Sequence, residues 1–168
     1  LTKGNNNNCL VNGRKQELGN GLNNSAIIAG SFGQALNQGE VVLAGGGFGQ
    51  RLGMAQTSFI QQSGTTTDAT ETLLTTQNLN STHILKVANA VIGFEANVIG
   101  VDISTGSTFD YGYTTHIVSA GQSGMNITAQ MKDAEAISFS VAVTGIEGKT
   151  IQWTADVKLW QNRTLKTF

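Results

Sequence analysis

The stretch GLNNSAIIAGSFGQALNQGEVVLAG at residues 21–45 repeats one pattern twice: a polar run rich in Asn and Gly, then an apolar pentad that ends in Gly. A related pentad, CLVNG, stands at residues 9–13. A unit this short cannot bury its own apolar residues, and it is typical of one turn in a coil of β-structure, where neighbouring turns stack. We therefore predict that residues 1–64 form a short β-roll of about four turns. The glycines of the polar runs recur with a period of 14–16 residues, at Gly4, Gly19, Gly33 and Gly49.

The pentads show no alternation of apolar and polar residues. Ala26, Ile27 and Ile28 follow one another directly, so both faces of such a strand need cover. The next turn of the coil covers one face, and a coil this thin leaves the other face for a partner chain. We also expect Cys9 to be a small buried residue, in the position that Ala26 and Val41 fill in the later repeats. The candidates for a core between chains are Cys9, Val11, Ile27, Ile28, Val41, Val42 and Leu43.

The sequence pattern changes at about Thr65, where longer stretches with two-residue alternation begin. Apolar and polar side chains alternate in residues 137–143 and again in residues 150–160. A short turn with two glycines separates these stretches, so we predict that they form a hairpin. The whole chain is thus predicted to be all-β, with residues 65–168 forming an antiparallel β-sandwich of about six to nine strands.

The composition argues against several classes of function. Only 12% of the residues are charged and the formal net charge is −1, which gives no electrostatic basis for binding nucleic acid or anionic lipid. The chain has no apolar run of 18 residues that would predict membrane insertion. Two histidines, His83 and His116, and one cysteine make a poor zinc site, so we predict no metal and no cofactor. The acidic residues are scattered singly along the sequence, so we predict that the protein is not an enzyme. The enzymatic alternative is a fibre tip that degrades a polysaccharide.

The repeats also carry a family resemblance. GLNNSAIIAG at 21–30 and ALNQGEVVLAG at 35–45 resemble the head repeats of YadA-like trimeric adhesins, which KGNNNNCLVNG at 3–13 and MAQTSFIQQSG at 54–64 match more loosely. In that family, three chains each wind a left-handed β-roll and pack their apolar faces against one another. The resemblance implies a homotrimer, in which two further copies of the chain supply the cover that the pentads lack.

The second part of the chain has a resemblance of its own. QTSFIQQSGTTTDATETLL at 56–74 and SVAVTGIEGKTIQWTADVKLW at 140–160 are similar to the terminal knobs of viral tail and capsid fibres. Such knobs follow repetitive trimeric shafts at the tip that contacts a cell, and trimeric tips of bacterial surface adhesins share the plan. The resemblance implies an extracellular location, on a virion tail fibre or on a bacterial surface.

Aromatic residues suggest where a ligand would bind. Sugar recognition uses an exposed aromatic ring for the apolar face of the sugar and nearby amide or carboxylate groups for its hydroxyls. Trp160 lies on the polar side of its predicted strand, where it is a ligand platform or a contact between subunits. The other candidates fall in a stretch that we expect to be a loop between strands, where binding residues usually lie. The candidate ligand-binding residues are Asp110, Tyr111, Tyr113, His116 and Trp160.

We therefore expect the distal tip of a homotrimeric fibre, in which residues 1–64 are a shaft and residues 65–168 are a knob that attaches to a cell-surface glycan. Three sites on one tip would turn weak contacts into lasting attachment by raising the effective concentration. The alternative is a purely structural knob that registers and caps the trimer without a ligand of its own.

Overall fold

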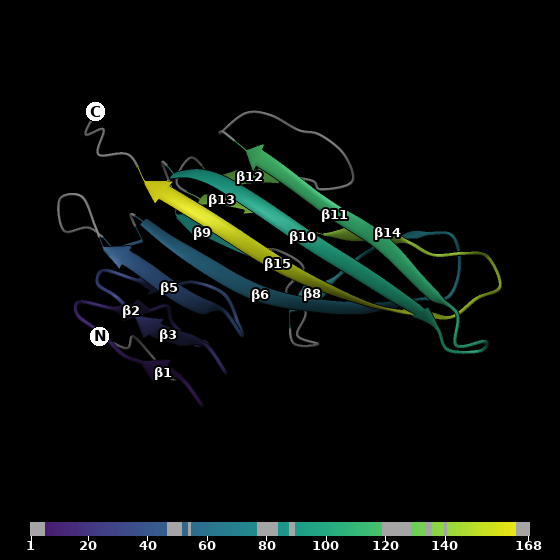
Figure 1. The fold of residues 1–168 in the computed structure, drawn as a ribbon, viewed down its shortest axis with the longest axis horizontal. Coiled ribbons are helices and arrows are strands. Elements are labelled where there is room, and N and C mark those ends of the chain that lie inside the picture. The colour runs from purple at the N-terminus through teal and green to yellow at the C-terminus, as the bar shows by residue number, and fades with distance from the viewer. Residues whose placement is uncertain are drawn as a thin grey trace.

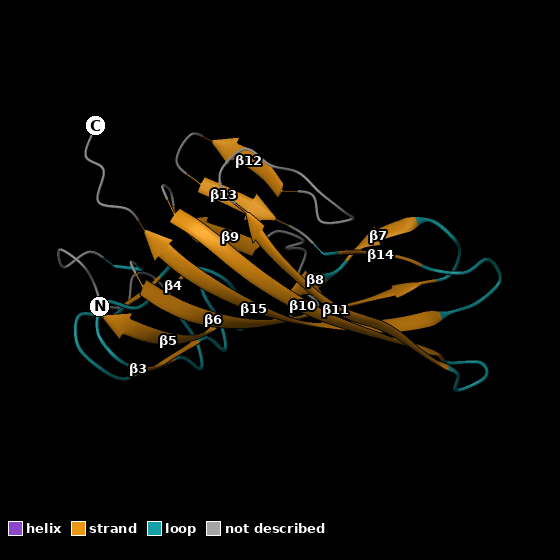
Figure 2. Cartoon of the chain, turned by 45° about the horizontal axis from the view of Figure 1, so that its top comes forward, coloured by secondary structure: helices purple, strands orange, loops and turns teal. Residues whose placement is uncertain are grey.

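The structure is a computed structural model, and all its described secondary structure is β. Strands and turns make up the described part of the chain, with no helix among them (Figure 2). This confirms the prediction of an all-β protein. The structure describes residues 6–46, 52–53, 55–76, 84–87, 90–118, 129–133, 136–139 and 141–163.

The N-terminal part winds as a coil with two strand positions in each turn. At the first position, β1, β3 and β5 pair side by side as parallel strands (Figure 1). At the second position, β2 and β4 pair in parallel. Backbone N–H groups of one turn donate to carbonyl oxygens of the next, for example Asn12 N to Ile27 O at 2.9 Å. The strands are β1 (Leu10–Val11), β2 (Glu17–Leu18), β3 (Ala26–Ala29), β4 (Gln34–Ala35) and β5 (Val41–Gly46).

The strand register corrects the expected place of Cys9. Leu10 lies opposite Ala26, and Ala26 lies opposite Val41. Cys9 therefore lies level with Ser25. The pentad alignment predicted that it would lie level with Ala26, and this prediction is wrong. The side chains of Cys9 and Ser25 make equivalent contacts, because the Cys9 thiol donates to the carbonyl of Asn7 and the Ser25 hydroxyl donates to the carbonyl of Asn23. The position thus holds a small hydrogen-bonding group at the wall of the coil.

The coil has a hydrophobic core of its own, which corrects part of the prediction for the core between chains. Ile27 and Val42 are fully buried within the single chain, so neither is available to a second copy. Cys9 packs against the same core. The prediction was wrong for Ile27 and Val42 because β2 and β4 lie across from β3 and β5 and cover their inner face. The core consists of Leu18, Leu22, Ile27, Ala35 and Val42.

The remaining candidates lie at the surface of the single chain. Val11, Ile28 and Leu43 are exposed, and Val41 is half-buried. In both β3 and β5 the second residue is buried and the third is exposed, so Ile27 and Val42 point into the coil while Ile28 and Leu43 point out. The apolar face that the sequence left without cover is therefore real, but fewer residues form it than were predicted.

The second half of the fold is built on four long strands that continue the sheet of the coil. The order of neighbouring strands is β1-β3-β5-β6-β15-β10-β11, and every pairing from β5 onward in this order is antiparallel. The boundary expected between residues 64 and 65 falls inside β6, which pairs with β5 along one edge and with β15 along the other. The long strands are β6 (Ala55–Thr66), β10 (Ala90–Asp102), β11 (Thr108–Val118) and β15 (Ile151–Arg163).

The alternation expected in residues 150–160 is present in β15. Trp153 and Leu159 are buried on the inner face of the sheet, whereas Gln152 and Asp156 are exposed on the other face. The predicted hairpin with residues 137–143 is wrong. β14 (Ala142–Thr144) pairs with β7 (Glu71–Leu73), because β15 already has a long partner along each edge.

Short strands lie over the inner face of the long sheet (Figure 2). Val143 in β14, Val141 just before that strand, and Leu74 belong to the same buried cluster as Trp153. The indole Nε1 of Trp153 donates to the hydroxyl of Thr66 at 2.8 Å. The other short strands are β8 (Thr75–Thr76), paired with β6, and the three-stranded sheet of β9 (Ile84–Val87), β12 (Ala129–Asp133) and β13 (Ala136–Phe139).

Candidate functional site

The face of the long sheet that points away from both hydrophobic cores is the candidate site, and we call it the outer face. Strand pairing places its side chains in rows that cross the sheet. One row contains Val41, Phe59, Lys158 and Glu95, from β5, β6, β15 and β10 in that order. The next row contains Gln61, Asp156 and Asn97. Residues that are far apart in sequence thus become neighbours on one surface.

These two rows line a hollow of about 480 Å³, which we call the sheet hollow. The volume lies within the range of roughly 300–1,000 Å³ that is usual for ligand pockets. Val41 and Phe59 make its apolar side. Its polar side carries two carboxylates, two amides and one ammonium group, from Glu95, Asp156, Gln61, Asn97 and Lys158.

The polar side chains of the sheet hollow make few contacts with one another. Gln61 Nε2 donates to Asp156 Oδ1 at 3.1 Å. Lys158 stands directly opposite Glu95 in the strand register, yet its Nζ lies 4.9 Å from the centre of the Trp160 ring. Among the described residues, no hydrogen bond or ion pair engages the side chain of Glu95 or Asn97. Within the described part of the chain, both groups are therefore unengaged.

Of the predicted ligand-binding residues, Trp160 lies beside the sheet hollow. It stands opposite Thr57 of β6 and Gly93 of β10, one row from Phe59 and Lys158. A Cβ atom placed on Gly93 would lie 3.2 Å from Cε3 of Trp160, so the indole packs over the glycine backbone. The prediction that Trp160 faces away from the core is confirmed by this position.

The other four predicted residues lie on strand β11 and not in a loop, which corrects their expected setting. In the register, Asp110 stands opposite Ile99, Tyr111 opposite Val98 and His116 opposite Phe94, while Tyr113 falls at an irregularity of the pairing. Their side chains lie outside the described residues. Ile99 also pairs with Thr154, six residues along β15 from Trp160, which corresponds to about 20 Å of strand. The structure therefore does not bring Asp110 and Trp160 together.

Local sequence pattern identifies the residues of the sheet hollow only in part. Glu95 and Asn97 are two residues apart in β10, and this spacing puts both side chains on one face of a strand. Their position next to Phe59 and Asp156 does not follow from spacing, because it depends on pairings between β6, β15 and β10 that are distant in sequence. Long-range register of this kind has no local signature.

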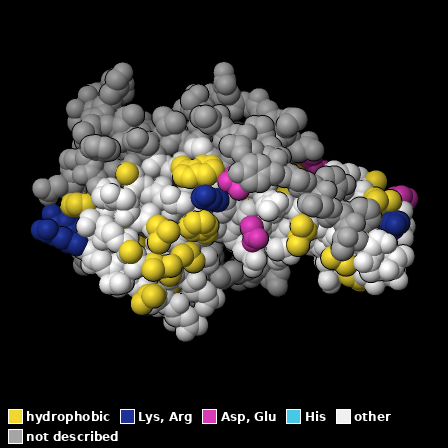
Figure 3. Space-filling model, viewed as in Figure 1, with side chains coloured by type: hydrophobic (Ala, Val, Ile, Leu, Met, Phe, Trp, Pro, Cys, Tyr) yellow, Lys and Arg dark blue, Asp and Glu magenta, His cyan; other side chains and the backbone are white. Residues whose placement is uncertain are grey.

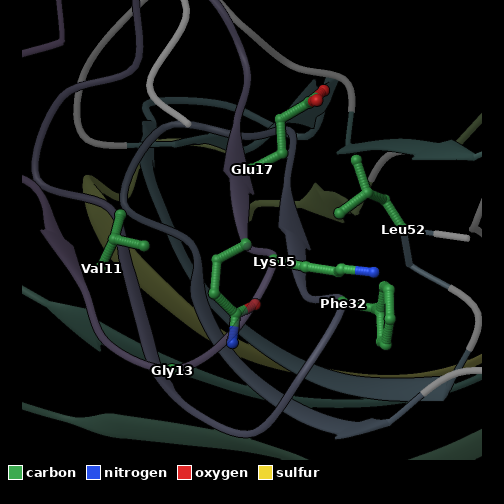
Figure 4. Close-up of a pocket in the computed structure, with 7 residues that line it drawn as sticks. Val11, Gly13, Lys15, Glu17, Phe32 and Leu52 are labelled. Carbon is green, nitrogen blue, oxygen red and sulfur yellow. The ribbon is translucent and has the colours of Figure 1, made fainter. Parts of the chain in front are cut away.

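A second hollow, of about 390 Å³, lies on the flank of the coil (Figure 4). There Lys15 points toward Phe32, with its Nζ 5.1 Å from the centre of the ring. The amide of Gln16 is already used by the fold, because it donates to the carbonyl of Gly30 at 2.9 Å and accepts from the N–H of Gly33 at 2.6 Å. The hydrogen bonds of Gln16 at the second hollow therefore link neighbouring turns of the coil.

Two further observations bear on the kind of site. Within the residues that the structure describes, no three His, Cys, Asp or Glu side chains gather closely enough to hold a metal ion. The same residues include no helix with the length and apolar character needed to cross a membrane. Comparisons with protein families, with curated proteins and with solved structures find no match to this chain.

Proposed function

We propose that this chain is the distal part of a homotrimeric fibre, with a β-roll shaft in residues 1–64 and a β-sandwich knob in residues 65–168 that attaches to a cell-surface glycan. The fibre would act outside the cell, on a virion or on a bacterial surface. The observation that carries the proposal is a group of exposed apolar side chains on the outer face of the coil. We call this group the apolar stripe, and it consists of Leu10, Ile28 and Leu43.

The apolar stripe crosses adjacent strands of one sheet. Leu10, Ile28 and Leu43 come from β1, β3 and β5, which pair with one another in this order. Each is about 40–60% exposed. Hydrophobic side chains gather over these strands on the face shown in Figure 3. Contiguous apolar surface of this kind marks an interaction site, so its burial between copies of the chain would stabilise an assembly.

The internal design of the coil supports the shaft half of the proposal. Successive turns repeat the same backbone conformation, because Asn8, Asn24 and Gly39 all have a positive φ, of 53°, 54° and 65°. Parallel stacking of equivalent strands is the arrangement expected of a β-roll. The layer of short strands over the inner face of the long sheet supports a sandwich for the knob.

The attachment half of the proposal rests on the sheet hollow, which joins an apolar side to unengaged polar groups. The alternative is a structural cap. It is favoured by the antiparallel pairing of β5 with β6, which ends the parallel coil and replaces a further turn. A cap would need the apolar stripe but not the sheet hollow.

The mass of the protein in solution tests the assembly. We expect light scattering to give about three times 17.6 kDa for the purified chain. Leu43→Asp is expected to yield a folded monomer, because a carboxylate in the apolar stripe would lose its hydration on assembly. The matched control is Ile99→Asp, which changes an exposed residue of the same sheet outside the stripe. A folded wild-type monomer would contradict the proposal.

A further inference from the structure

We propose that the sheet hollow is a binding site for a neutral saccharide. This inference rests on the proposed function, since it names the class of glycan and the place where the knob would hold it. It moves the site away from Asp110, Tyr111 and Tyr113 on β11 and onto the surface shared by β5, β6, β10 and β15.

The apolar side of the sheet hollow provides a platform for the C–H face of a sugar ring. Phe59 is 39% exposed and stands between Val41 and Lys158 in its row. Val41 and Lys158 flank Phe59 on the two neighbouring strands, so the backbone that carries the platform is set by strand pairing on both sides. Preorganised aromatic side chains contribute binding energy at a low cost in conformational entropy.

The polar side of the sheet hollow offers partners for hydroxyl groups. Glu95 and Asn97 project from alternate positions of β10, and neither is engaged by another described side chain. Carboxylate oxygens accept from hydroxyls, whereas an amide both donates and accepts. Asp156 and Gln61 bond to each other at 3.1 Å and leave further lone pairs and N–H groups for a ligand. A polyhydroxylated ligand can therefore satisfy every polar group on this side.

The charges of the sheet hollow select against acidic ligands. Glu95 and Asp156 contribute two negative charges and Lys158 contributes one positive charge, which leaves one net negative charge. The ammonium group of Lys158 is also directed over Trp160, at 4.9 Å from the ring centre. A sialylated or sulfated sugar would place a third anionic group beside these two carboxylates, which is electrostatically unfavourable.

A glycan array with matched variants tests the inference. The probes are neutral oligosaccharides that end in glucose, galactose, mannose or N-acetylglucosamine, and sialylated or sulfated oligosaccharides. We expect the wild-type chain to bind neutral probes. Glu95→Ala and Asn97→Ala are each expected to weaken that binding at least about fivefold, because each removes a hydrogen-bonding group. The control is Gln152→Ala, which removes an exposed amide of the same face outside the hollow, and which should bind like the wild type.

The outcomes separate this inference from the proposed function. A trimer whose glycan binding is unchanged in both variants would overturn the saccharide site and leave the fibre-tip function intact. Binding restricted to sialylated or sulfated probes would also overturn it. A trimer that binds none of the probes would overturn the inference and favour the structural cap, whereas a monomer without glycan binding would overturn the proposed function as well.

Discussion

Nζ of Lys149 lies 3.3 Å from Oδ2 of Asp102, and the two residues lie in different turns at one end of the long strands. Asp102 ends β10 and is buried, and its Oδ1 accepts from the N–H of Ser104 at 3.0 Å and from the Ser104 hydroxyl at 2.6 Å. The turns are also joined by the N–H of Ile103, which donates to the carbonyl of Thr150 at 3.0 Å. One carboxylate thus fixes its own turn and ties it to the turn before β15.

This arrangement predicts a loss of stability in acid. Hydrogen bonds from the hydroxyl and the N–H of Ser104 hold the pKa of Asp102 well below its usual value of 3.8. The folded state therefore binds the proton less readily than the unfolded state, so the stabilisation is complete above about pH 4 and declines as the pH falls below it. Urea unfolding of the wild type and of Asp102→Asn should differ at pH 7, and the difference should shrink between pH 4 and pH 2. A constant difference across this range would contradict the prediction.

Gly30 should tolerate no side chain. It has a φ of +98°, and a Cβ atom built on it would collide with the carbonyl oxygen of Ala44 in the next turn. We expect Gly30→Ala to lower the free energy of unfolding by about 2–4 kcal/mol, because it adds a steric clash to an unfavourable φ. Gly21→Ala is the control, since Gly21 also has a positive φ, of 66°, but a Cβ there meets nothing within 4 Å. Denaturant unfolding should show a cost of about 1 kcal/mol for the control. Equal costs would rule out the contact between turns.

The hydroxyl of Thr66 should matter more than those of its neighbours. It accepts a hydrogen bond from the buried Trp153 Nε1 at 2.8 Å, and Thr66→Val would remove this acceptor. The expected cost is about 1–3 kcal/mol of unfolding free energy. Thr65→Val changes an exposed residue one position away and should stay within about 0.5 kcal/mol of the wild type. Thermal or urea unfolding followed by Trp fluorescence measures both.

Substitutions at the adjacent residues Ile27 and Ile28 should affect different properties, the stability of the coil and its assembly. Ile27 is fully buried in the core of the coil, so Ile27→Ala is expected to cost about 2–5 kcal/mol in unfolding free energy. Ile28 is 44% exposed in the apolar stripe, so Ile28→Ala should leave the fold intact and weaken the proposed trimer. Unfolding experiments and light scattering on both variants separate the two roles. A destabilised coil in Ile28→Ala would show that the two side chains are not on opposite faces.

The features of the fold that were predicted correctly from the sequence are those that depend on local spacing. The coil repeat and the alternation in β15 were predicted, because each depends on spacing within one segment. The position of Cys9 was not, because an unbroken apolar pentad gives no sign of which residue points inward. The hairpin expected between residues 137–143 and 150–160 failed for a different reason. A turn joins β14 to β15, but the partner of each strand is decided by distant residues such as Thr72 and Ile60.

The candidate site shows the same division. Trp160 was identified from its place on the polar side of one strand. Glu95 and Asn97 were not, since their relation to Phe59 is created by two strand pairings that span the chain. Asp110 and Tyr111 were expected in a loop because they follow a Ser- and Thr-rich segment. In the structure that segment is only a short turn, and β11 begins at Thr108.

The continuous pairing of β6 has a mechanical consequence. Because β6 is hydrogen-bonded to β5 on one edge and to β15 along twelve residue pairs on the other, there is no hinge at which the coil could swivel against the long strands. A pull along the strands would load these ladders in shear, so many hydrogen bonds would have to break together before the two parts separate. The sheet would therefore transmit tension between the coil and the long strands as a stiff element.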